Sequence, residues 1–286
     1  MKSTKKIISI DKLHPFENHP YKVQDNEEME ALAESIKVHG IVSPVIVRPF
    51  ENTADEYEII SGHRRVMASR KAGITEVPAL VVSLDRDAAA IVLVDSNLHR
   101  EHILPSEKAY AYKMKLDAMK HQGWRSDLTS NQLGGKLETA DLVGAETGDS
   151  KNQVRRYIRL TNLIPEILQY VDDGRISFTP AVELSYLNEQ EQQDLLEQIE
   201  QSDCTPSLSQ ACRFKKISQG EGLTPEVIAE IMEEEKANQR EMFKVPMERI
   251  RQYIPNANAK QAEDFVLKAC EHYRKFLIRQ RNRDER

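Results

Sequence analysis

The stretch Ile59-Ile60-Ser61-Gly62-His63-Arg64-Arg65-Val66 joins an apolar strand to the start of a basic helix through one glycine. The apolar and aromatic residues before it predict a strand over Tyr57–Ile60. Gly62 lets the backbone turn sharply, and the first helical turn then offers free N–H groups beside the guanidinium groups of Arg64 and Arg65. Because such a junction suits a phosphate, we expect an anion-binding site here.

Outward from this junction, helix and strand signals alternate. The pattern predicts a helix over Glu27–His39 that ends at Gly40, a strand over Ile41–Val47 with Pro44 marking a bulge or an edge, a strand over Val77–Leu84 and a helix over Asp85–Asp95. A second polar run, Asp95–Glu101, closes the last of these helices. Two polar runs in one small α/β domain indicate a nucleotide site.

From Pro105 onward the pattern predicts helices only. A helix begins at Pro105 and runs to Gln122, and a polar loop covers Gly123–Gly135. The segment Thr139–Leu160 has the layout of a helix-turn-helix. In it Gly144 allows close contact between helices, Gly148 makes the turn, and Val154 and Ile158 anchor the second helix.

The second helix of this motif carries four basic residues and no acidic one over Lys151–Arg159. Asn152, Arg155, Arg156 and Arg159 share one face, which can enter a major groove and offer hydrogen bonds to base edges. The alternative is a solvated surface helix. We expect DNA contacts from Lys151, Asn152, Gln153, Arg155, Arg156 and Arg159.

The sequence after the helix-turn-helix predicts further helices that support it and a separate C-terminal region. Helices are expected over Glu166–Asp172, Pro180–Leu187 and Glu189–Gln201, followed by a linker over Pro206–Gly222. Lys260–Arg279 reads as one long helix with Phe265, Ala269, Tyr273 and Phe276 on one side. We expect this stripe to mediate self-association.

Composition limits the classes of protein. The chain has 286 residues, 30% of them charged, and a formal net charge of −6, so DNA binding must come from a local patch. No apolar run approaches a membrane span, and the basic start has too short an apolar part for a signal peptide. We expect a cytoplasmic protein that makes no membrane contact. Cys204, Cys212 and Cys270 lack ligand spacing and predict reduced thiols.

Several separated blocks resemble the ParB partition family: Leu32–Ile36, Gly40–Pro49, Gly62–Arg65, Asn97–Arg100, Pro105–Ala109 and Ile176–Leu184. The resemblance implies an α+β fold, with a small ParB/sulfiredoxin-like α/β domain, an all-α helix-turn-helix domain and a helical C-terminal region. We expect the nucleotide domain at 1–102, the DNA-binding domain at 103–215 and the C-terminal region at 216–286.

The resemblance also implies CTP and magnesium as cofactors. Gly62, His63, Arg64 and Arg65 are the implied triphosphate holders, Ser43 lies where the first motif reaches the nucleotide, and Asn97 and Arg100 match the third motif. Asn97 is the candidate magnesium ligand. His99 and His102 could share a metal, but no third ligand is visible.

Two positions depart from many relatives, which carry glutamate where this chain has His63 and Ser96. Serine has no basic group to activate water, and a histidine beside arginines favours its neutral form. Asp95 lies one residue early and could substitute for the missing carboxylate, although its side chain would point elsewhere. We therefore expect CTP to be bound more readily than hydrolysed, and any enzyme activity to be a weak CTPase.

The favoured function is a partition protein of plasmid or mobile-element type. We expect it to bind a palindromic site on double-stranded DNA as a homodimer, to associate with the nucleoid, to work with a ParA-type ATPase and to close as a CTP-dependent clamp. One alternative is a transcription regulator that uses only the helix-turn-helix. Another is a phosphotransfer or nuclease enzyme on the same fold.

Overall fold

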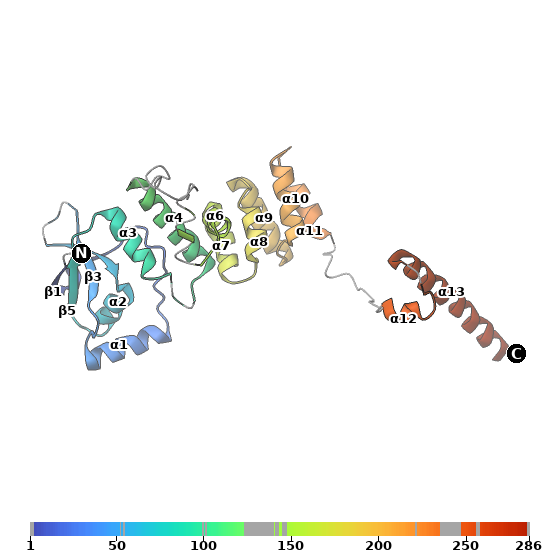
Figure 1. Cartoon of the computed structure of the whole chain (residues 1–286), viewed down its shortest axis with the longest axis horizontal. Helices are drawn as coiled ribbons and strands as arrows, with labels where there is room; N and C mark the ends of the chain where they lie inside the picture. Colours follow the sequence, from blue (N-terminus) through green and yellow to red (C-terminus); the bar gives the residue numbers. More distant parts are fainter. Residues whose placement is uncertain are drawn as a thin grey trace, which may run out of the picture. The chain divides into compact units, whose positions relative to one another are not determined.

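The computed structural model describes residues 3–51, 53, 55–98, 100, 102–122, 140, 143–144, 148–220, 222–234, 247–255 and 258–284. The chain divides into two compact units, residues 1–234 and 235–286. Figure 1 shows the first unit as a small sheet with its helices, followed by a series of helices. The expected α+β class is confirmed, and the described chain after Pro105 contains no strand.

The amino-terminal domain is built on a five-stranded mixed sheet. Its strands are β1 (Ser3–Ser9), β2 (Leu13–Pro15), β3 (Val45–Pro49), β4 (Tyr57–Ser61) and β5 (Glu76–Val82), in the order β1-β5-β3-β4-β2. Strand β5 is antiparallel to β1 and parallel to β3, while β4 is antiparallel to β3 and parallel to β2. The predicted strand at 41–47 begins only at Val45, because Pro44 has no N–H to donate to a ladder. The register shift lies between Ile46 and Val47.

Successive residues of β4 point to opposite faces of the sheet, and both faces are covered. Ile59 packs in one core with Val66 of α2 (His63–Lys71), whereas Ile60 packs in another with Leu93 of α3 (Arg86–Asp95). Helix α1 (Glu27–His39) packs on α2 and begins at Asn26, whose side chain accepts a hydrogen bond from the Met29 N–H at 3.1 Å. The junction that ends β4 is thus held between two cores.

Helix α4 (Pro105–His121) connects this domain to the helices that follow. It packs against α3 on one side and against α6 (Lys151–Arg159) on the other. Behind α6 come α7 (Pro165–Asp172), α8 (Phe178–Leu184), α9 (Glu189–Ser202), α10 (Leu208–Ser218) and α11 (Pro225–Glu233). One continuous apolar core joins α7 to α11.

The linker prediction for 206–222 is wrong, because α10 lies there. Ser207 and Gln210 form a capping box that starts the helix, and Phe214 is fully buried in the core with Ile228 of α11. The Gln210 side-chain amide also donates to the Ile231 carbonyl at 2.7 Å. The boundary expected at 215/216 therefore falls inside a helix.

The second unit contains α12 (Met247–Arg251) and α13 (Ala259–Asp284). Helix α13 includes the helix expected at 260–279 and exposes Phe265, Tyr273, Phe276 and Leu277. No helix in the described ranges is long and apolar enough to cross a membrane. The three cysteines are free and exposed.

Replacing Phe214 tests whether α10 belongs to the core. Phe214→Ala should lower the free energy of unfolding by about 3–5 kcal/mol, since it removes a fully buried ring and leaves a cavity. Urea denaturation followed by circular dichroism measures this loss. Leu208→Ala on the same helix is the matched control, because Leu208 is 45% exposed. Equal losses in the two variants would contradict the assignment.

Candidate functional site

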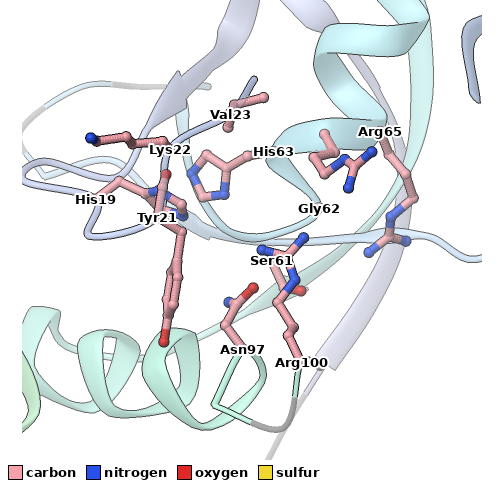
Figure 2. Close-up of a pocket in the computed structure, with 11 residues that line it drawn as sticks. His19, Tyr21, Lys22, Val23, Ser61, Gly62, His63, Arg65, Asn97 and Arg100 are labelled. Carbon is pink, nitrogen blue, oxygen red and sulfur yellow. The ribbon is translucent and has the colours of Figure 1, made fainter. Parts of the chain in front are cut away.

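A pocket of about 170 Å³ lies where the β4–α2 junction, the end of α3 and the segment 19–23 meet. Figure 2 shows its lining side chains: His19, Tyr21, Lys22, Val23, Ser61, Gly62, His63, Arg64, Arg65, Asn97 and Arg100. Six of the seven predicted nucleotide residues line it. Ser43 does not, and the residues from 19–23 were missed because no local pattern marks them.

Gly62 is required at the floor of this pocket. Its φ of +107° is a left-handed conformation, and an added Cβ would lie 2.8 Å from Val45 Cγ1 and 3.0 Å from Arg65 Nη2. It is the N-cap of α2, whose first turn carries no acidic side chain. The amino-terminal end of α2 therefore faces the pocket with uncompensated N–H groups and a favourable dipole for an anion.

The two arginines of the junction have different partners. Arg64 forms an ion pair with Glu28 of α1 at 3.0 Å. Arg65 Nη1 donates to the carbonyls of Ser43 and Pro44, the latter at 2.9 Å, and burial lowers the pKa of its guanidinium. Ser43 is therefore linked to the pocket through Arg65 rather than by lining it.

Asn97 and Arg100 extend from the end of α3 toward Ser61 (Figure 2). The Asn97 amide nitrogen donates to the Leu93 carbonyl at 2.8 Å and to Ser96 Oγ at 3.2 Å. These bonds leave the amide oxygen as the group that can meet a ligand. Asp95 forms an ion pair with Lys115 of α4, so it points away from the pocket as expected.

Two imidazole rings close one side of the pocket. His63 and His19 have ring centroids 3.9 Å apart, and His63 Nε2 accepts a hydrogen bond from the Phe16 N–H at 3.4 Å. Burial, and then the neighbouring His19, lower the pKa of His63 to about 3. Burial also lowers the pKa of His19. The predicted neutral form of His63 is confirmed, but its main cause is burial rather than the adjacent arginines.

The described part of the predicted helix-turn-helix includes the turn glycine Gly148 and the second helix, α6. Gly148 has φ +75°, and a Cβ on Gly144 would lie 2.4 Å from the Asp149 carbonyl oxygen, so the backbones are in close contact. Val154 is buried in a core with Val143 and Met119. The other residues of the first helix, Thr139, Asp141–Leu142 and Ala145–Thr147, lie outside the described residues.

The basic face of α6 divides into two parts. Asn152 and Arg155 are exposed, and Lys151 and Gln153 are half-buried. Arg156 and Arg159 instead contact α8 and its C-cap residue Ser185. Arg156 Nη2 donates to Thr179 Oγ1 at 3.2 Å, and Arg159 Nη2 donates to the Ser185 carbonyl at 3.1 Å. The outward part of the face is therefore the amino-terminal half of α6.

Helix α4 contacts both sites. Its Lys115 pairs with Asp95 beside the pocket, while its Lys108 and Tyr112 bind Asp149, which precedes the α6 N-cap Ser150. Burial acts in the opposite direction, yet the bonds from Lys108 and Tyr112 hold the pKa of Asp149 below its usual value. A single helix thus positions the end of α3 and the start of α6.

The segment that lines the pocket also reaches the helical domain. The Lys22 N–H donates to Glu107 of α4 at 2.8 Å, and its ammonium lies 3.2 Å from Asp172 of α7. Asp172 also accepts from the Ser106 N–H at 2.9 Å. Lys22 therefore connects a pocket wall to two helices of the following domain.

No cluster of three or more metal-binding side chains occurs among the residues with described positions. The His99 side chain lies outside the described residues, so the proposed His99–His102 pair cannot be placed. The amide oxygen of Asn97 remains the candidate magnesium ligand.

The ParB N-terminal domain model matches residues 1–98, and the ParB HTH domain model matches residues 101–207. A nucleoid occlusion protein of Listeria innocua is 31% identical over 196 residues, which are 68% of this chain and 62% of the relative. A probable chromosome 1-partitioning protein ParB of Deinococcus radiodurans is 34% identical over 175 residues, 61% of this chain and 53% of the relative.

The chain thus spans between half and two thirds of the length of these relatives. Among solved structures, C-terminally truncated ParB from Caulobacter crescentus complexed to the centromeric parS site is similar at 22% identity and a TM-score of 0.42, over 79% of this chain and 98% of that one. The same protein complexed with CTP-gamma-S gives 26% identity and a TM-score of 0.32, over 68% and 98%.

The buried imidazole makes stability depend on pH. His63 has a folded pKa below its ordinary value of 6.5, so its contribution is complete above pH 6.5 and is lost as the pH falls toward 3. Between these limits, the stability advantage of the wild type over His63→Gln should shrink by up to about 1.4 kcal/mol per pH unit. Urea titrations at several pH values measure it.

His39→Gln, at an exposed position of α1, is the matched control for loss of a histidine. A constant difference between the wild type and His63→Gln across this pH range would contradict a buried neutral imidazole.

Proposed function

Because this chain belongs to the ParB family, we propose that it is a sequence-specific DNA-binding partition protein whose amino-terminal domain binds CTP and acts as a DNA clamp switch. The observation that carries this proposal is α4, which binds a carboxylate beside the anion pocket and another beside the start of α6. The relatives are named for partition and for nucleoid occlusion, so the proposal concerns what both would need: specific DNA binding under nucleotide control.

The pocket has the composition that a nucleoside triphosphate requires. Arg65 and Arg100 bring positive charge, and the amino-terminal end of α2 adds N–H donors. Lys22 and Arg64 also line the pocket, where each is paired with a carboxylate outside it. The neutral His63 contributes a ring surface rather than charge. The proposal that the bound base is cytosine rests on the family resemblance. The Asn97 amide oxygen suits magnesium, which usually takes one or two protein oxygens beside substrate phosphates.

Binding is better supported than hydrolysis. Among the described residues no carboxylate lines the pocket, and a histidine whose pKa is about 3 holds a proton poorly at neutral pH. The Ser96 hydroxyl donates to the Leu93 carbonyl at 2.9 Å, and Asp95 is engaged by Lys115. None of these groups is arranged to activate a water molecule, which counts against the enzyme alternative.

DNA reading is assigned to the outward half of α6. Recognition helices place their amino-terminal residues against base edges, and here those residues are Lys151, Asn152, Gln153 and Arg155. The exposed apolar side chains of α13 support a homodimer, which implies a palindromic DNA site. On the basis of the family resemblance, the proposal also includes association with a ParA-type ATPase and with the nucleoid.

Isothermal calorimetry tests the nucleotide site. The wild type should bind CTP in preference to the other ribonucleoside triphosphates, and Arg100→Ala should weaken CTP binding at least about tenfold, because it removes a charge-assisted contact to phosphate. Arg86→Ala is the control, since Arg86 lies outside this pocket and pairs with Glu17. The clamp proposal loses its basis if CTP is not preferred.

Substitution of Arg155 tests the assignment of base reading. Arg155→Ala should weaken binding to a selected DNA site by about 1–3 kcal/mol, with little effect on a scrambled duplex of the same length. Fluorescence anisotropy with labelled duplexes provides the comparison. Equal losses on both duplexes would assign Arg155 to the DNA backbone instead.

A further inference from the structure

Two cationic side chains meet on the ring of Tyr186, just beyond α8. The Arg159 guanidinium carbon lies 3.6 Å from the ring centroid, and Lys215 Nζ lies 3.7 Å from it. Arg159 is the last residue of α6 and Lys215 belongs to α10, so three separate segments build the cluster. Tyr186 is 36% exposed, and the cluster therefore reaches the surface.

The hydrogen bonds of Arg159 leave donors for a ligand. One Nη2 bond goes to the Ser185 carbonyl, whereas a guanidinium carries five N–H donors. Its Nε is buried and is one of two such side-chain atoms without a hydrogen-bond partner in the described part of the chain. The donors that an anion can reach are therefore the remaining terminal N–H groups of the guanidinium, and a phosphate is an acceptor that suits them.

The positive charge of the cluster favours an anion, and one nearby carboxylate partly neutralises it. Glu183 Oε2 lies 2.8 Å from Lys215 Nζ, so two cations are opposed by one carboxylate. Arg156, which lies 5.0 Å from the Phe178 ring, adds further positive charge on the same side of α8. The cluster therefore has a net positive charge, which Glu183 reduces.

The position of the cluster relative to α6 identifies the anion. Lys151, Arg155 and Arg159 are spaced four residues apart and share one face of the helix. At 1.5 Å per residue, Arg159 lies about 12 Å along the axis from Lys151, which is about the width of the major groove. When the amino-terminal half of α6 lies in the groove, its last turn therefore reaches the DNA backbone.

We propose that Arg159, Tyr186 and Lys215 form a binding site for one phosphate of the DNA backbone, beside the base pairs that α6 reads. This inference rests on the proposed DNA-binding function. Arg159 then fixes the position of the protein on the duplex and does not read a base. Glu183 is the residue that limits the strength of this contact.

Salt-dependent binding of a selected duplex and a scrambled duplex tests the site. Lys215→Gln should weaken binding to both duplexes by the same factor, about eightfold at 0.1 M monovalent salt, and should reduce the salt slope by about one. Glu183→Gln should strengthen binding to both duplexes. Lys216→Gln, an exposed neighbour on α10, is the control and should leave the slope nearly unchanged.

Duplexes with single methylphosphonate linkages locate the phosphate. One neutral linkage at the flank should weaken wild-type binding by the factor that Lys215→Gln produces, and that linkage should cause no further loss in Lys215→Gln. If Lys215→Gln and Glu183→Gln both weaken binding and lower the melting temperature, the ion pair is only structural. An unchanged Lys215→Gln, or a loss confined to the selected duplex, also overturns the inference. A wild type that binds neither duplex overturns the proposed function itself.

Discussion

The arrangement of both sites depends on two buried polar side chains of α4, each of which is paired with a carboxylate from another element. Lys115 is 1% exposed and Tyr112 is fully buried, and such groups are tolerated only when they are hydrogen-bonded or paired. Lys115 forms an ion pair with Asp95 at the end of α3, and the Tyr112 hydroxyl donates a hydrogen bond to Asp149 in the segment before α6. These bonds fix Asn97 and Arg100 at the pocket and Ser150 at the N-cap of α6, so the positions of both sites follow from one helix.

A second connection starts in the pocket wall. His19 packs on His63, and three residues later Lys22 binds Glu107 and Asp172 of the helical domain. A ligand that shifts the imidazole pair or the end of α3 would therefore act on contacts that also hold α4 and α7. This arrangement gives the proposed nucleotide control of DNA binding a physical basis, because two of the three elements that line the pocket, segment 19–23 and the end of α3, also contact the helices around α6.

Local signals predicted the parts of the fold that depend on local chemistry. The glycine turn at Gly62, the turn at Gly148 and the helical period of Glu27–His39 each placed an element correctly. Strand β1 was missed because most of its side chains are exposed, which leaves no apolar pattern. The role of His19 and the contact between Arg65 and the Ser43 carbonyl come from tertiary packing, and no sequence spacing encodes them. The same holds for Arg156 and Arg159, whose partners on α8 separate them from the exposed half of α6.

The central claim is that one chain couples its anion pocket to its DNA-reading helix. The most direct measurement is the lifetime of the full chain on a selected DNA site, with and without CTP. The account predicts that CTP changes this lifetime severalfold in the wild type and leaves it unchanged in Arg100→Ala. Identical wild-type lifetimes with and without CTP would contradict the coupling.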